Sequence, residues 1–483
     1  MQLAVVQRIL GILLTLFSLT LLPPIAIAWW TTDASLSSFI YAFFLIVIIG
    51  LLLWLPVKDI KKELRIRDGF VVVVLFWIGL GLTGSIPFLL SETPHLSFTN
   101  AVFESLSGLT TTGATVITGI DNLPLPILFY RQELQWLGGM GIIVLAVAIL
   151  PVLGIGGMQL YRAETPGPVE DTKLTPRITE TAKALWYIYL TMTVACAFLY
   201  FSAGMNLFDA VTHSFSTVSI GGFSTHDLSF AYFDSKIIDA VAVLFMLLSG
   251  MNFTLHFLAW RHTSITPYQH DAELRAYLFI LLSIGVICCL YLILMGSYHD
   301  LTTAITDGIF QTVSIATTTG FTTTHYQSWP NFLPVLLLFT SFVGACAGST
   351  GGGLKVIRVL LLYKQGLREI RRLVHPNAII TIKLGRKPVS ERVINAVWGF
   401  FAAYVSVFGV LLLLLMATGL DQVTAFSAVA ACLNNLGPGL GDVSSHYGDI
   451  NDSAKWLLCF AMILGRLEIF TLLVLLTPAF WRK

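Results

Sequence analysis

Four short segments of the chain share a pattern that can bind a cation through main-chain oxygen atoms. Each is a run of helix-compatible residues that ends in a glycine, at Gly113, Gly222, Gly320 and Gly437. A half-helix inside a membrane points a partial negative charge from its C-terminal end toward a cation. The residues that follow can aim backbone carbonyls at an axis, and four such strands form oxygen rings that replace an ion's hydration shell. Glycine permits backbone angles that other residues avoid, so the pattern predicts an ion-conducting ring made by one chain.

The segments repeat with matching beginnings and matching spacing. They begin at residues suited to cap a helix N-terminus, which are Asn100, Asp209, Asp307 and Thr424. A second glycine follows each terminal glycine: Gly139 after 26 residues, and Gly250, Gly348 and Gly465 after 28 each. This spacing predicts a fourfold internal repeat. Close helix packing alone would explain the second set of glycines but not the first.

A glycine-rich loop is predicted within an otherwise apolar stretch after the third segment. It consists of Gly344, Ala345, Cys346, Ala347, Gly348, Ser349, Thr350, Gly351, Gly352 and Gly353. Each glycine costs a helix about 1 kcal/mol relative to alanine, so a regular helix cannot continue through it. The loop lacks the Gly-Lys-Ser/Thr ending of a phosphate-binding loop. We therefore expect a flexible break below the third segment.

Arg466 lies inside an apolar stretch that is long enough to cross a membrane. An arginine at membrane depth costs roughly 2.5–3.5 kcal/mol on insertion scales and needs a polar partner. A structural pair with Glu468 is one interpretation. Residues two apart on a helix do not face each other, so the spacing argues against that pair.

The elements that would position these residues are membrane-spanning helices. The chain is 56% hydrophobic and 11% charged, which a soluble domain of this size could not accommodate. Several apolar runs reach the ~20 residues that cross a bilayer. We expect a first helical hairpin at 3–30 and 36–57, followed by four pairs of spans. These pairs are 70–90 with 127–152, 184–204 with 236–260, 275–297 with 332–364, and 390–418 with 454–478.

The predicted fold is an all-α polytopic membrane protein with four in-chain helix–pore-helix–helix repeats around one pore, plus an N-terminal two-helix hairpin. The hairpin occupies residues 1–68. The repeats occupy 69–183, 184–272, 273–388, with a broken second helix, and 389–483. This layout has ten crossings, with both ends on one side.

Charge placement predicts the orientation. Of the 28 basic residues, 24 fall on the predicted inner side. The exceptions are Arg131, Lys236 and Lys455 on the outer side and Arg466 within a span. The positive-inside rule therefore places both termini in the cytoplasm. Acidic residues gather on the outer side, where they either attract cations or simply keep the loops soluble. The sequence has no catalytic or metal-ligand constellation and no basic arm for nucleic acid, so we expect neither an enzyme nor a nucleic-acid partner.

The four glycine-ended segments resemble the filter segments of the TrkH/KtrB superfamily of potassium transporters. The matching residues are Thr111-Thr112-Gly113, Ile220-Gly221-Gly222, Thr318-Thr319-Gly320 and Asn435-Leu436-Gly437, here called glycine turns 1 to 4. The resemblance covers nearly the whole chain. It implies that the glycine turns bind potassium, because relatives with serine at the first of the four glycines tend to pass sodium. It also implies that the glycine-rich loop is an intramembrane gate and that Arg466 is a positive barrier in the pore.

The resemblance further implies a homodimer in the bacterial inner membrane, with one pore per protomer. It implies TrkA-type cytosolic subunits that bind nucleotides such as NADH and ATP, whereas this chain has no dinucleotide fingerprint and is expected to hold no cofactor of its own. The basic inner segment 355–392 would contact that partner or anionic membrane lipid. The alternative is a secondary transporter that couples potassium to protons or sodium, although such proteins usually have inverted repeats.

Overall fold

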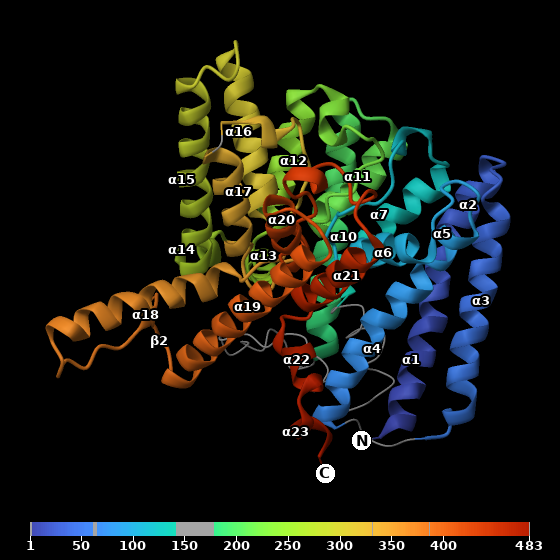
Figure 1. Ribbon diagram of the computed structural model, residues 1–483, viewed down its shortest axis with the longest axis horizontal. Coiled ribbons are helices and arrows are strands. Elements are labelled where there is room, and N and C mark those ends of the chain that lie inside the picture. The colour runs from blue at the N-terminus through green and yellow to red at the C-terminus, as the bar shows by residue number, and fades with distance from the viewer. Residues whose placement is uncertain (1, 61–64, 142–177, 331, 386, 483) are drawn as a thin grey trace.

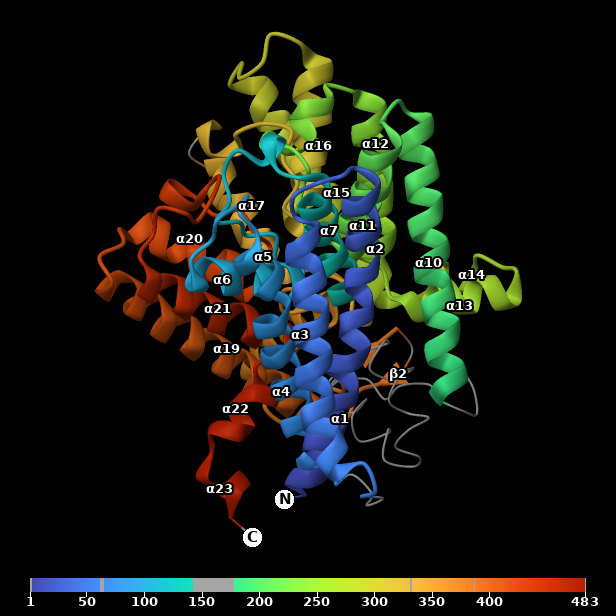
Figure 2. The same ribbon diagram turned by 90° about the vertical axis from the view of Figure 1, so that its right-hand side faces the viewer.

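The computed structural model describes residues 2–60, 65–141, 178–330, 332–385 and 387–482. Within these ranges the chain is mainly helical, and its strands are the short antiparallel pair β1 (Lys383–Leu384) and β2 (Lys387–Pro388). The predicted fold class, an all-α polytopic membrane protein, is confirmed. Both termini lie at the same end of the molecule (Figure 1, Figure 2).

The N-terminal hairpin packs two long apolar helices side by side, as Figure 2 shows. It comprises α1 (Leu3–Ser18), η1 (Leu19–Leu21), α2 (Leu22–Trp30), α3 (Leu36–Trp54) and η2 (Leu55–Val57). The two backbones touch at a pair of glycines, because a Cβ on Gly11 would lie only 2.8 Å from the carbonyl oxygen of Gly50. Small residues at such a contact let membrane helices approach closely.

Each of the four repeats contains a first helix, a short pore helix and a second helix. The first helices are α4 (Ile66–Gly84) with α5 (Ile86–Leu90), α10 (Ile178–Ser202), α15 (Ala272–Leu294) and α19 (Glu391–Ala417). The pore helices are α6 (Phe98–Leu109), α11 (Leu207–Ser219), α16 (Leu301–Ala316) and α20 (Gln422–Leu433). The second helices are α7 (Leu125–Gly139), α12 (Lys236–Ser249), α17 (Phe332–Val343) and α21 (Asp452–Arg466).

Shorter elements follow the pore helices and the second helices. The connections from the pore helices to the second helices contain η3 (Ile120–Asn122), η5 (Ser229–Phe233), η6 (Tyr326–Ser328) and η7 (Gly441–Val443). The second helices of repeats 2 to 4 are followed by α13 (Phe253–His262) with α14 (Thr266–His270), by α18 (Val356–Val374), and by α22 (Phe470–Leu476) with α23 (Pro478–Trp481). Figure 1 shows α18 leaving the helix bundle sideways.

The repeats are joined in a closed cycle. The second helix of each repeat packs against the pore helix of the next: α7 against α11, α12 against α16, α17 against α20, and α21 against α6. The last of these contacts returns to the first repeat, so the four pore helices surround one centre. This arrangement brings together segments that are more than 300 residues apart in the chain, such as α6 and α21.

The predicted helix caps are wrong by three residues in repeats 1, 2 and 4 and by seven in repeat 3. The side chains that accept the first free backbone N–H groups belong to Ser97, Asn206, Asp300 and Asp421. Asn100, Asp209, Asp307 and Thr424 instead lie inside the pore helices. In repeat 2 the displaced residue still stabilises the helix start, because Asn206 Nδ2 donates to Asp209 Oδ2 over 2.7 Å. Several cap-competent residues stand close together at each start, so residue type alone did not select the right one.

The predicted continuous spans also differ from the structure. Six described helices are long and apolar enough to cross a membrane, or eight if each sharply bent pair counts as one span. The bends measure 91° between α12 and α13 and 117° between α21 and α22. We predicted a break only in the third repeat, where the structure divides the stretch 332–364 into α17 and α18. Hydropathy averages over a window and does not detect the direction of a helix.

Two sequence-based expectations fall outside the described residues. The second span of repeat 1 was expected to continue to residue 152, and α7 is described to Gly139 with a further turn to residue 141. The inner segment that contributes basic residues between 162 and 177 is likewise outside the described ranges.

Candidate functional site

Each pore helix ends in the same backbone conformation. The first residue of every glycine turn has a positive φ, as do the four glycines; these residues are Thr111, Gly113, Ile220, Gly222, Thr318, Gly320, Asn435 and Gly437. The second residue of every turn donates its N–H to a carbonyl five residues back, over 2.7–2.9 Å. A left-handed residue with this hydrogen bond is a Schellman-type helix end. The sequence repeat is therefore matched by a repeat of backbone geometry.

The four glycine turns form a closed ring. A Cβ placed on each end glycine would lie closer than 3.0 Å to a carbonyl oxygen of the next turn. The glycine–oxygen pairs, taken in order, are Gly113 with Gly221, Gly222 with Thr319, Gly320 with Leu436, and Gly437 with Thr112. The fourth pair closes the cycle. All twelve predicted residues of the glycine turns therefore lie together around one centre.

A side-chain hydrogen bond joins the last glycine turn to the first. Asn435 Nδ2 donates to Thr112 Oγ1 over 3.0 Å and to the Met462 carbonyl over 3.1 Å. The first residue of each turn is buried, with a relative exposure of at most 1%, whereas the end glycines Gly113, Gly222 and Gly320 are partly exposed. Backbone that is not helical is tolerated at membrane depth only where protein or a watery cavity surrounds it.

The glycine-rich loop, residues 344–353, contacts the ends of three pore helices. Gly352 N donates to Thr318 Oγ1 over 2.8 Å, and Gly353 N donates to the Asn434 carbonyl over 3.2 Å. Thr350 Oγ1 donates to the Val218 carbonyl over 3.1 Å. These partners are the first residue of a glycine turn or lie just before it. The loop therefore lies beside the C-terminal ends of the pore helices.

The first half of the loop is held by the helices of repeats 2 and 3. Cys346 N donates to the Gly250 carbonyl over 2.9 Å, and the Gly348 carbonyl accepts from Phe253 N over 3.0 Å. The loop has positive φ at Gly344, Gly348 and Gly353, which explains three of its glycines. The other members, Ala345, Ala347, Ser349 and Gly351, lie between these points.

Arg466 connects the loop to glycine turn 1. Its Nη1 donates to Thr111 Oγ1 over 3.2 Å and to the Thr350 carbonyl over 3.1 Å, and its Nη2 donates to the Gly138 carbonyl over 2.5 Å. The loop and Arg466 together contact all four pore segments. Among the described residues, Glu468 forms its ion pair with Arg358 instead of the alternative partner Arg466.

Two charged residues that we did not predict as site residues lie next to the ring and stabilise it. Glu104 on α6 and Arg131 on α7 are fully buried, with Arg131 Nε 2.9 Å from Glu104 Oε1. Arg131 also donates to the Ser224 carbonyl over 3.1 Å, and its guanidinium lies 4.3 Å from the centre of the Phe223 ring. A glutamate inside an apolar pore-helix sequence requires a partner, and that requirement was the available sequence signal.

A third residue that we missed is Glu273 at the start of α15. Its Oε1 accepts from Ala347 N over 2.7 Å and from Ile357 N over 3.1 Å. One carboxylate therefore holds both the glycine-rich loop and the first turn of α18. No spacing rule links residue 273 to residues 347 and 357, because the contact exists only after repeat 3 has folded.

The chain that follows glycine turn 2 carries a compact cluster of titratable groups. His226 lies 2.5 Å from Asp121 and 3.2 Å from Asp209, and its ring stacks on Tyr232. Burial alone would lower the pKa of His226, but hydrogen bonds to Asp209 and Asp121 outweigh it and raise the pKa. Asp209, predicted as a helix cap, thus forms part of a paired cluster.

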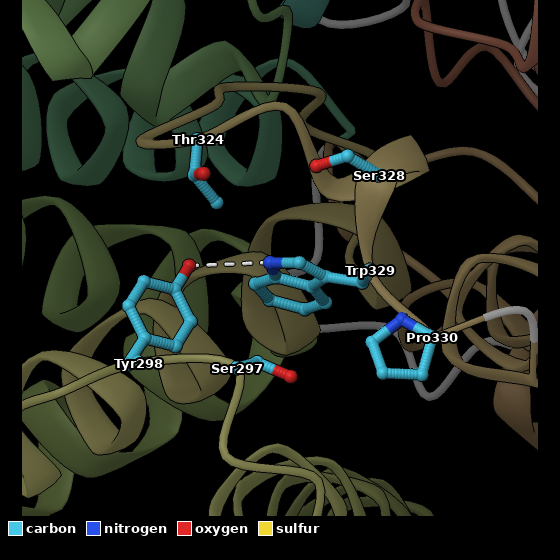
Figure 3. Close-up of a pocket in the computed structure, with 6 residues that line it drawn as sticks. All are labelled: Ser297, Tyr298, Thr324, Ser328, Trp329 and Pro330. Atoms are coloured by element: carbon cyan, nitrogen blue, oxygen red, sulfur yellow. Dashed lines mark hydrogen bonds between the residues drawn. The ribbon is translucent and has the colours of Figure 1, made fainter.

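A polar surface hollow of about 400 Å³ lies beside the third repeat (Figure 3). Its lining residues are Ser297, Tyr298, Thr324, Ser328, Trp329 and Pro330. Trp329 Nε1 donates to the hydroxyl of Tyr298 over 3.1 Å across this hollow. The lining contains no charged side chain and no residue of the glycine turns or the glycine-rich loop.

Comparison with known proteins covers the whole chain. The family model TrkH, described as a cation transport protein, matches residues 35–483. A Trk system potassium uptake protein TrkH from Vibrio parahaemolyticus is 60% identical over 485 residues, and one from Escherichia coli K12 is 55% identical over 483 residues; both alignments cover 100% of each chain. A crystal structure of the potassium transporter TrkH from Vibrio parahaemolyticus matches with a TM-score of 0.91, 57% identity and full coverage of both chains. The chain therefore belongs to the TrkH family of cation transport proteins.

Proposed function

We propose that this protein takes up potassium through a pore whose filter is the ring of four glycine turns. The relatives named above are potassium uptake proteins, and their alignments extend over the full chain. The single observation that carries the proposal is the closed cycle of glycine–carbonyl contacts between successive turns. A ring of backbone oxygens can replace the water shell of a dehydrated cation. Membership of a transport family also agrees with the prediction that the chain is not an enzyme.

We propose that the glycine-rich loop and Arg466 close this pore on its inner side. The loop hydrogen-bonds at the start of glycine turns 2, 3 and 4, and Arg466 hydrogen-bonds to Thr111 of glycine turn 1. A fixed positive charge next to the ring raises the energy of a nearby cation. Residues with positive φ in the loop mark points where the backbone could change direction when the pore opens.

The wider assembly is proposed from the relatives and from charge. Proteins named as parts of a Trk system imply further Trk components, and we propose TrkA-type cytosolic subunits that carry the nucleotide, NADH or ATP. A homodimer in the bacterial inner membrane, with both termini cytoplasmic, is proposed with them. The basic segment 355–392 lies toward the end of the chain's bundle that holds both termini (Figure 1).

The second candidate is a transporter that couples potassium to protons or sodium. Membrane-embedded charge and broken helices, both present here, are common in such transporters. The four repeats run in the same direction, whereas transporters are usually built from inverted repeats. Flux into liposomes separates the two: a pore carries current down the potassium gradient alone, and a coupled transporter requires the second ion.

The filter is tested by the variant Gly113→Ser. Serine at a φ of +79° is strained by about 1–2 kcal/mol and displaces the neighbouring carbonyl, so the potassium-to-sodium flux ratio should fall by about tenfold. The ratio is measured on purified protein in liposomes, with Gly79→Ala, which meets nothing within 4 Å, as the control. An unchanged ratio in Gly113→Ser would contradict a filter role for the ring.

The gate is tested by the variant Arg466→Ala. Removal of the charge and of its bonds to Thr111 and Thr350 should raise potassium flux through the chain alone by at least about tenfold, the factor for ~1.4 kcal/mol. Arg372→Ala, which removes an arginine that is 42% exposed, is the matched control and should leave flux unchanged. Equal flux in the wild type and Arg466→Ala would exclude the proposed barrier.

A further inference from the structure

Glycine turn 2 differs from the other three at its middle position. Thr112, Thr319 and Leu436 occupy this position in turns 1, 3 and 4, whereas turn 2 has Gly221. Gly221 is not among the residues with positive φ, so its backbone does not require glycine. A Cβ at Gly221 would instead lie 2.9 Å or less from the side-chain amide of Gln135. The missing side chain makes room for that amide.

Gln135 is a fully buried residue of α7 that clamps turn 2. Its Nε2 donates to the Gly221 carbonyl over 2.5 Å, and its Oε1 accepts from Phe223 N over 3.0 Å. One amide therefore fixes the peptide groups on both sides of Gly222. The Gly221 carbonyl is also the oxygen against which Gly113 of turn 1 packs, so the clamp acts directly on the ring.

The amide clamp is found at this turn among the described residues, whereas in turn 4 the Gly437 carbonyl accepts from the hydroxyl of Tyr447 over 2.7 Å. Gln135 stands four residues before Gly139 in the second helix of repeat 1. The residues four before the corresponding glycines of repeats 2 to 4 are Met246, Gly344 and Ala461, none of which has a side-chain hydrogen-bond donor. In turns 1 and 3 the middle threonines bond to Thr110 and Thr317 of their own segments instead.

We propose that Gln135 is a positioning residue that fixes the Gly221 carbonyl in the conducting ring and so contributes to discrimination between potassium and sodium. The inference rests on the proposed filter function of the ring. Ion discrimination has been ascribed to cavity size and to the number and field strength of the coordinating oxygens. A hydrogen bond to one of these oxygens affects both, because it restrains the position of the oxygen and uses one of its lone pairs.

The first test replaces Gln135 by a residue of similar length without an amide. Gln135→Met should lower the potassium-to-sodium flux ratio by about fivefold, which corresponds to ~1 kcal/mol, the usual net value of one hydrogen bond. Gln132→Met is the matched control, because Gln132 is buried on the same helix and neither of its side-chain polar atoms has a hydrogen-bond partner in the described structure. The control should keep the wild-type ratio. A wild-type ratio in folded Gln135→Met overturns the inference.

The second test perturbs the same contact from the other side. Gly221→Ala should displace the Gln135 amide and lower the ratio to a similar extent, and Gly221→Ala combined with Gln135→Ala should be no worse than either change alone. Additive effects would show that the two residues act independently and would overturn the inference. This pair also provides a test should Gln135→Met fail to fold, as judged by its melting temperature.

The Gly113→Ser variant separates the two levels of the argument. If Gly113→Ser lowers the ratio and the Gln135 and Gly221 variants do not, the ring is the filter and the clamp is merely structural. If none of these variants changes the ratio, the proposed function of the ring itself fails.

Discussion

At the scale of single residues, the site depends on polar groups that are buried deeply but paired. Arg131 and Glu104 have no exposed surface, and each makes further hydrogen bonds to the chain that leaves glycine turns 1 and 2. A buried charge is tolerable only when its partner and its remaining hydrogen bonds are supplied. Such pairs therefore fix the relative position of two repeats that the sequence separates.

The pair can be tested by removing one partner. Glu104→Ala leaves Arg131 buried without its carboxylate, and we expect the free energy of unfolding to fall by about 3–5 kcal/mol. Glu133→Ala is the matched control, since Glu133 is a buried carboxylate on α7 without an ion-pair partner among the described residues. Unfolding in detergent, followed by circular dichroism, should show a much larger loss for Glu104→Ala. Equal losses of unfolding free energy in the two variants would indicate that the ion pair does not contribute to stability beyond an unpaired buried carboxylate.

At the scale of elements, the interrupted second helices supply the parts of the site that continuous helices could not. Arg466 is the last residue of α21, and the 117° bend that follows turns the chain away from the ring. The glycine-rich loop takes the same place in repeat 3. The interruptions in repeats 2 and 3 free backbone N–H and carbonyl groups that bond to a neighbouring repeat, as in the bonds from Cys346 N to the Gly250 carbonyl and from Gly353 N to the Asn434 carbonyl.

Glu273 is the element-scale test, because it joins α15 to both sides of the loop break. Glu273→Ala removes two hydrogen bonds to a carboxylate, worth about 1.5–3 kcal/mol each, so the flux of the isolated chain should rise by roughly tenfold or more. Glu273→Gln keeps an acceptor oxygen and should give an intermediate flux. A flux below the wild-type value in Glu273→Ala would mean that the carboxylate holds the loop open, contrary to our proposal.

At the scale of the whole molecule, one chain performs what a symmetric assembly of four chains would otherwise do. The cycle of contacts from α7 and α11 through α21 and α6 puts the repeats around one centre, and the turns close the same cycle at the backbone level. Turns 1 and 3 share the sequence Thr-Thr-Gly, whereas turns 2 and 4 are Ile-Gly-Gly and Asn-Leu-Gly, and the positive-φ positions coincide in all four. The symmetry of the site is therefore closer in the backbone than in the sequence.

A glycine series tests that symmetry. Alanine at Gly113, Gly222, Gly320 or Gly437 should lower both the potassium flux and the potassium-to-sodium flux ratio in each case, because every Cβ would collide with the next turn and the left-handed backbone adds about 1–2 kcal/mol of strain. Gly204→Ala is the control, since its φ is +110° but nothing lies within 4 Å of the added Cβ. Flux is measured at matched protein levels in liposomes. Loss at only one or two of the four positions would refute a closed ring.

The sequence by itself determined the membrane class, the repeat and the identity of the residues in the glycine turns. These features are local: hydrophobic runs, the spacing of Gly113 and its three counterparts, and an arginine at membrane depth can each be recognised in a linear chain. The sequence also predicted the break at residues 344–353, because glycine acts on the backbone at its own position.

Only the tertiary structure decided the partners. The clamp of Gln135 on Gly221, the bond from Arg466 to Thr111 and the grip of Glu273 on the loop join residues that are 74 to 355 positions apart. No periodicity encodes such pairs, because each contact depends on how the repeats close around the centre. The caps of the four pore helices and the bends in repeats 2 and 4 were missed for a related reason. Several neighbouring residues could cap a helix or end it, and packing against the next repeat selected among them.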